Sequence, residues 1–241
     1  MLPFPSQQSP VLDLVCLPFV GGQEEAIMAG IDLVIVPAMA APNYFNPVVV
    51  VGEQYVADYP VDLTIASKIL TRGENDFTIK DINSTTIFHI KSKLLSLHDR
   101  RRMLDSAGNV VLSLQQKILS CHRRWQAFKG DSTDPKDLLF SVRKSSILQF
   151  KNKLDVFVGE NKREESPDFR IKGGWHEGSC SVCLGKSKTI IAQMQKGHSA
   201  KTVVLDAESF KVSVYPNVDY AFIVALVVIL DEINADRSGE D

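Results

Sequence analysis

The sequence predicts a mainly β fold, an antiparallel sandwich or barrel of about twelve strands, with an apolar helix buried near the C-terminal end. Short runs of alternating apolar and polar residues recur from residue 48 onward, and each run fits one half-buried strand. Turns rich in Gly, Asp and Asn separate many of these runs, which favours hairpins over helical crossovers. The third observation is residues 220–230, all of which are uncharged and mostly aliphatic or aromatic.

Residues 1–47 do not fit this pattern. Seven prolines interrupt every apolar run there, and proline blocks both helices and central strands. We expect an extended or disordered N-terminal tail over 1–47, followed by a single domain over 48–236. No Lys or Arg precedes Lys68, so the basic start of a secretory signal is not found. Met28 is an alternative initiator, which would make 1–27 an upstream segment that is not translated.

Twelve segments fit the strand pattern. The alternation is clearest at Val110, Leu112 and Leu114, which would share one face of a strand. Many short antiparallel strands joined by tight turns are typical of a sandwich or a barrel. The predicted strands are 61–70, 77–80, 86–91, 101–105, 110–115, 125–129, 138–144, 154–159, 169–172, 181–185, 189–194 and 210–215.

The C-terminal apolar run differs in kind from the strands. A helix that is apolar on every side must be buried all round, in a protein core or in a bilayer. A membrane span needs about 20 residues, and this run is about half that length. We therefore predict a core helix over about 218–234, with a membrane span and a further strand as the alternatives. Asp219 lies where a helix N-terminus favours an acid.

The near-neutral composition hides a strong segregation of charge. The chain has a net charge of −2, yet residues 68–218 hold 26 Lys and Arg against 16 Asp and Glu. Residues 1–67 hold seven acids and no base, and 219–241 are acidic as well. A basic body attracts anionic lipid or nucleic acid, and the alternative is a solvated surface that happens to be basic. Four scattered cysteines indicate a reduced intracellular protein.

No motif in the sequence indicates catalysis, so we expect a protein that is not an enzyme and that needs no cofactor. Cys180 and Cys183 have metal-like spacing, but no second Cys or His pair stands nearby. We interpret them as core cysteines and expect no metal site. His98 and His122 start two similar segments, and we interpret them as hydrogen-bonding residues in turns.

One cluster of basic residues is a candidate site for an anion. Arginine's planar fork suits phosphate geometry, and lysine adds a point charge. Successive hairpins would bring two basic segments together, and the alternative is a solvated strand end paired with Asp99 and Asp105. We expect the cluster to be exposed, so that charge reversal at 100–102 leaves the fold intact. Its members are Lys91, Lys93, Arg100, Arg101, Arg102, Arg123 and Arg124.

Five short motifs lie in a characteristic order along the chain: LHDR at 97–100, RWQAF at 124–128, DSTD at 131–134, KLDVF at 153–157 and YPNVDYAF at 215–222. With these motifs the chain resembles the plant LURP-one-related family from about residue 57 to 234. The resemblance implies a twelve-stranded antiparallel barrel around a hydrophobic C-terminal helix, as in tubby C-terminal domains and phospholipid scramblases. A helix of that kind would fill a lumen that side chains alone leave open.

The resemblance also implies a class of function. The family has links to plant defence in some members, and the relation to tubby implies a regulator that holds phosphoinositides at a membrane. We therefore expect a cytoplasmic protein that binds anionic phospholipid head groups and is peripheral at the membrane. The alternative is a nucleic-acid-binding or transcription-linked regulator that uses the same basic surface and shuttles to the nucleus.

Overall fold

In a computed structural model of the protein, the predicted strands form a closed antiparallel barrel around one helix. The structure describes residues 46–71, 74–92, 100–117, 124–145, 153–174, 178–197 and 209–238. The prediction of a tail over 1–47 therefore concerns residues that lie almost wholly outside this part of the chain, and it stays a prediction.

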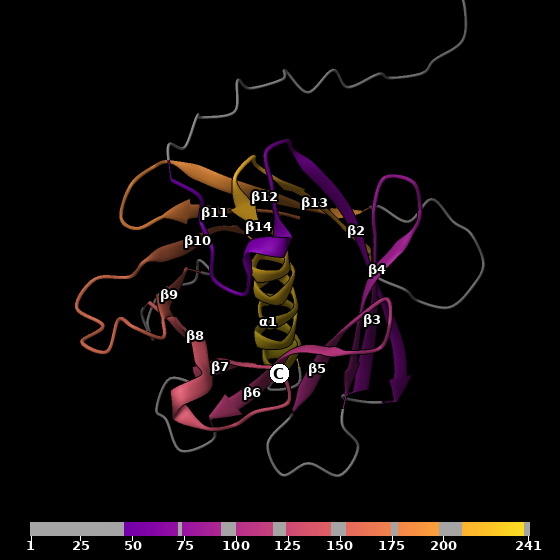
Figure 1. Cartoon of the computed structure of the whole chain (residues 1–241), viewed down its shortest axis with the longest axis horizontal. Coiled ribbons are helices and arrows are strands. Elements are labelled where there is room, and N and C mark those ends of the chain that lie inside the picture. The colour runs from indigo at the N-terminus through magenta and orange to yellow at the C-terminus, as the bar shows by residue number, and fades with distance from the viewer. Residues whose placement is uncertain are drawn as a thin grey trace, which may run out of the picture. The chain divides into compact units, whose positions relative to one another are not determined.

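The barrel consists of twelve strands in sequence order, and it closes where the last strand, β13, pairs with the first, β2. Figure 1 shows the ring of strands around α1. Each predicted strand is found, with ends that differ from the prediction by a few residues at most. The strands are β2 (Val61–Thr71), β3 (Glu74–Lys80), β4 (Thr86–Ser92), β5 (Arg101–Asp105), β6 (Val110–Lys117), β7 (Arg124–Lys129), β8 (Leu138–Lys144), β9 (Leu154–Val158), β10 (Phe169–Gly174), β11 (Ser179–Leu184), β12 (Ile190–Gly197) and β13 (Ser209–Val214).

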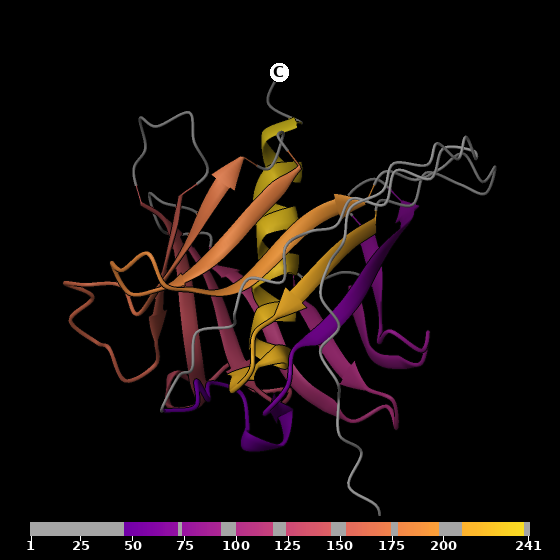
Figure 2. The same cartoon turned by 90° about the horizontal axis from the view of Figure 1, so that it is seen from above.

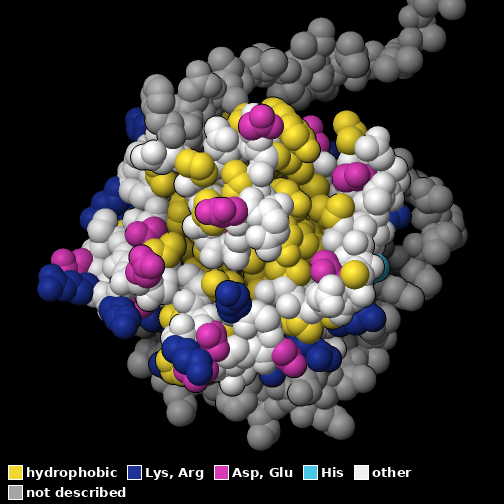
Figure 3. Space-filling view, viewed as in Figure 1, with side chains coloured by type: hydrophobic (Ala, Val, Ile, Leu, Met, Phe, Trp, Pro, Cys, Tyr) yellow, Lys and Arg dark blue, Asp and Glu magenta, His cyan; other side chains and the backbone are white. Residues whose placement is uncertain are grey.

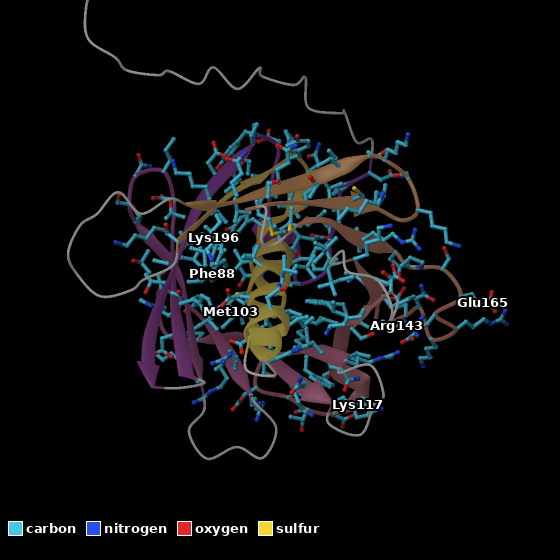
Figure 4. All side chains as sticks on the ribbon, turned by 180° about the vertical axis from the view of Figure 1, so that it is seen from behind. Phe88, Met103, Lys117, Arg143, Glu165 and Lys196 are labelled. Carbon is cyan, nitrogen blue, oxygen red and sulfur yellow. The ribbon has the colours of Figure 1, made fainter. Side chains whose placement is uncertain are left out.

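The helix α1 (Tyr220–Ser238) fills the barrel. Ala221 to Leu230 are all fully buried, and inward-facing side chains such as Phe88 and Met103 belong to the same core cluster. Figure 4 shows these two side chains beside α1. No helix in the described part of the chain is long and apolar enough to cross a membrane. The apolar run is thus a core helix, and the predicted alternatives of a membrane span and a strand are wrong.

Short elements that the sequence did not reveal close the end of the barrel at which α1 begins. They are η1 (Glu53–Tyr55), β1 (Val56–Ala57) and β14 (Val218–Asp219), with η2 (Pro135–Asp137) in the loop between β7 and β8. β1 pairs with β14, and Val48 forms a parallel bridge with Val218. Figure 2 shows α1 running from this end, at the bottom of the view, to its C-terminal end at the top.

Asp219 joins the N-terminal segment to the start of the helix. It is fully buried, and its Oδ1 accepts a hydrogen bond of 3.0 Å from the Phe222 amide, which caps α1. Its Oδ2 accepts from three successive backbone N–H groups, those of Val50 at 3.1 Å, Val51 at 2.6 Å and Gly52 at 3.1 Å. One carboxylate thus satisfies donors that are far apart in the sequence.

We predict that Asp219→Asn lowers the free energy of unfolding by about 3 kcal/mol, because bonds to a charged acceptor contribute about 1.5–3 kcal/mol each and an amide keeps only one acceptor oxygen. Urea unfolding followed by circular dichroism measures this loss. Asp81→Asn is the matched control, since Asp81 accepts two backbone N–H bonds in an exposed turn. Equal losses in the two variants would show that the buried carboxylate has no special role.

Candidate functional site

The structure describes five of the seven predicted basic residues. Lys93 and Arg123 lie outside the described residues. Lys91 is exposed near the end of β4, and Arg124 begins β7. Arg100 precedes β5, while Arg101 and Arg102 are its first two residues. The barrel places these strands in the order β4-β5-β6-β7, so the described members do come from neighbouring parts of the wall.

Arg101 does not belong to the surface. It shares the inward face of β5 with Met103 and is only 3% exposed. Its Nη2 lies 2.6 Å from Oε1 of Glu232, near the C-terminal end of α1. The prediction that 100–102 are all exposed is therefore wrong, because successive residues of a strand point to opposite faces. Reversing the charge of Arg101 would place two acids together in the interior.

The other two arginines of this segment lie against a loop. Arg100 donates to Oδ1 of Asp131 at 2.8 Å and to the Asp131 carbonyl at 2.7 Å. Arg102 is more distant, with its Nη1 at 3.8 Å from Oδ2 of the same carboxylate. Among the described residues the partner is thus Asp131, whereas Asp105 accepts bonds within its own turn and Asp99 lies outside the described part of the chain. The Asn109 side chain in that turn, with backbone N–H groups, lowers the pKa of Asp105.

A second ion-pair group ties the loop between β9 and β10 to the barrel wall. Both guanidinium Nη atoms of Arg124 donate to the Glu164 carboxylate, with Nη2 at 2.6 Å from Oε2. Arg143 adds a bond of 3.2 Å to the same oxygen, and its guanidinium lies 4.6 Å from the Phe157 ring centroid. Figure 4 shows Arg143 on the outer side of the barrel, away from α1. Arg124 is therefore partly neutralised by Glu164.

Four outward-facing cations nevertheless form two like-charged pairs across neighbouring strands. Lys91 on β4 stands opposite Arg102 on β5, and Lys117 on β6 stands opposite Arg124 on β7. Lys91 and Lys117 are exposed, and the Arg102 side chain is 36% exposed. We call these four residues the basic wall. The sequence pattern missed Lys117, since it ends its strand outside the basic clusters; the register of β6 and β7 is what places it there.

The described residues hold no group of three His, Cys, Asp or Glu side chains that could bind a metal ion. Cys180 and Cys183 are buried on β11 and form no disulfide, which confirms their interpretation as core cysteines. The remaining partners of the predicted site, Asp131, Glu164 and Glu232, also escaped the sequence pattern. Each lies far along the chain from its arginine, and only the barrel topology brings them together.

Comparison with known proteins identifies the family. The model of the LURP-one-related family matches residues 61–231. Protein LURP-one-related 15 of Arabidopsis thaliana is 49% identical over 78% of this chain and 87% of its own length, and Protein LURP1 of the same plant is 41% identical over 78% and 91%. An X-ray structure of an Arabidopsis thaliana protein, 42% identical, matches with a TM-score of 0.60 over 77% of this chain and 98% of that one. The chain therefore belongs to the LURP-one-related family.

Proposed function

We propose that this protein is a non-enzymatic module that binds anionic phospholipid surfaces through its basic wall and is peripheral at the membrane. The observation that carries the proposal is the register of two like-charged cross-strand pairs, Lys91 opposite Arg102 and Lys117 opposite Arg124. Like charges directly opposite each other on neighbouring strands destabilise a sheet. An anionic partner on the outside would offset that cost.

The neighbouring strands show the ordinary arrangement. Arg143 on β8 stands opposite Asp155 on β9, and Arg170 on β10 stands opposite the same acid, with its Nε at 2.9 Å from Oδ1. Opposite charges thus alternate around β8–β10, whereas cations stand together on β4–β7. The contrast supports a surface selected for an anion, since arginine and lysine suit phosphate oxygens.

The expected binding is weak and reversible. Each Lys or Arg near an anionic membrane contributes about 1 kcal/mol, and the attraction falls off within a Debye length of about 8–10 Å. Four cations, partly neutralised by the carboxylates near them, give a few kcal/mol. Binding should therefore increase with the fraction of anionic lipid and decrease as salt is added.

The test is sedimentation with vesicles of graded phosphatidylserine or phosphoinositide content, at low and physiological salt. Lys91→Gln/Lys117→Gln removes two exposed cations and leaves the ion pairs of Arg100, Arg101 and Arg124 intact. We expect its partition coefficient to fall about 30-fold, which corresponds to about 2 kcal/mol. The matched control is Lys80→Gln/Lys188→Gln, which removes the same charge from exposed positions elsewhere on the barrel and should bind as the wild type does.

Three results would overturn the proposal. The wild type fails to sediment with anionic vesicles, the two double variants partition alike, or the wild type binds duplex DNA while showing no response to lipid. The last result would assign the basic wall to a nucleic-acid backbone instead.

A further inference from the structure

The end of the barrel at which α1 begins carries an unusual apolar surface. The large apolar side chains that are exposed among the described residues are Val49, Tyr59 and Ile82, with exposed fractions of 45%, 64% and 81%. Val49 and Tyr59 flank η1 and β1, and Ile82 lies in the turn that joins β3 to β4. All three positions are at this end. Extended apolar surface on a folded domain indicates an interaction site.

Further apolar groups lie at the same end of the barrel. Tyr55 ends η1 and Tyr220 begins α1, and their ring centroids are 5.7 Å apart. Burial raises the pKa of Tyr220, and the nearby Tyr55, Asp219 and Tyr59 add to the shift. Beside Val49 a pocket of about 440 Å³ is lined by Val48, Val50, Val158, Phe169 and Leu184, among others.

Figure 3 looks onto this end of the barrel. Apolar side chains gather over the middle of the view, acidic side chains lie among them, and Lys and Arg lie mostly toward the edge. We call the surface formed by Val49, Tyr55, Tyr59, Ile82 and Tyr220, together with the adjoining pocket, the apolar mouth. Apart from the buried Asp219, the charged residues nearest to it in the chain are four acids, Glu53, Asp58, Asp62 and Asp81, and one cation, Lys80.

We propose that the apolar mouth is the docking surface for a basic segment of a partner protein that also carries apolar side chains. Charge complementarity selects this occupant, because acids outnumber cations next to the apolar centre. Residues 1–45 of the same chain are a poor match, since they hold four acids and no Lys or Arg. The apolar groups would supply the buried contact area, and the acids would orient the bound segment through its basic side chains.

This surface is separate from the basic wall, so the inference goes beyond lipid binding. It assigns to the protein a second ligand, which is basic, whereas the lipid ligand is anionic. The protein would then link a partner protein to an anionic membrane. The two sites are tested independently, because the experiment below uses no lipid.

The probe is a fluorescent peptide of alternating Lys and Leu, and its counterpart has Glu in place of Lys. We expect fluorescence anisotropy at physiological salt to show binding of the Lys peptide by the full chain and none of the Glu peptide. Tyr59→Ser/Ile82→Ser should weaken binding about tenfold or more, since both side chains lose contact area. Both positions are exposed, so the variant should keep the wild-type melting temperature.

A single charge reversal tests whether an acid beside the apolar mouth contributes to binding of the peptide. Glu53→Lys should weaken binding of the Lys peptide about fivefold. Glu165→Lys makes the same change at an exposed position that Figure 4 shows far from α1, and it should have no effect. Equal binding of the two peptides, unchanged binding by the Tyr59→Ser/Ile82→Ser variant, or a wild type whose mouth is covered in a concentration-dependent oligomer would overturn the proposal.

Discussion

Replacing Ala225 by aspartate is expected to remove the cooperative unfolding transition and to leave little of the protein in the soluble fraction. Ala225 is fully buried in the middle of α1, and its neighbours Val224 and Leu226 are fully buried as well. A carboxylate there has no partner and no access to water, which costs several kcal/mol. Domains are stable by about 5–15 kcal/mol, so one such change removes much of the total.

The control for this prediction inserts the same charge on the surface. Ala107 lies in the exposed turn between β5 and β6, and Ala107→Asp should unfold as the wild type does. Thermal unfolding by circular dichroism compares the two variants directly. A soluble Ala225→Asp variant with an unchanged melting curve would mean that α1 leaves the barrel at little cost.

The strands and the central helix were predictable because each is a local pattern. The alternation at Val110, Leu112 and Leu114 gives the face of β6 without any knowledge of its neighbours. The residues alone did not decide between a sandwich and a barrel, because closure depends on β13, the last strand of the barrel, meeting β2, the first. Six residue pairs join those two strands, and nothing in either segment marks the other as its partner.

The candidate site was harder to predict than the fold. Arg101 and Arg102 are adjacent and identical in type, yet one faces α1 and the other faces solvent. The pattern of β5 was ambiguous, because its two faces would each carry one arginine and one apolar residue. Asp219 was placed correctly at the helix start, but its bonds to residues 50–52 span more than 160 positions. Contacts between residues so far apart in the chain depend on how the strands are arranged, and a local sequence pattern does not reveal them.

Arg101→Met is expected to lower the free energy of unfolding by about 3–5 kcal/mol, because it leaves the Glu232 carboxylate buried without its cation. The Glu232 side chain is only 11% exposed, so water compensates little of the loss. Guanidinium unfolding followed by the fluorescence of the buried Trp125 measures the change. Arg102→Met, one residue further and 36% exposed, should cost less than about 1 kcal/mol.

The double variant Arg101→Met/Glu232→Leu tests the origin of that loss. If the loss of the cation beside the Glu232 carboxylate is responsible, removing that carboxylate should restore stability to that of the wild type or raise it by about 1–4 kcal/mol, as replacing buried ion pairs with apolar side chains often does. A double variant as unstable as Arg101→Met would show that Arg101 acts through other contacts. Restored stability would also mean that the fold does not require the pair. The basic wall could then be studied in a barrel whose interior carries no ion pair at this position.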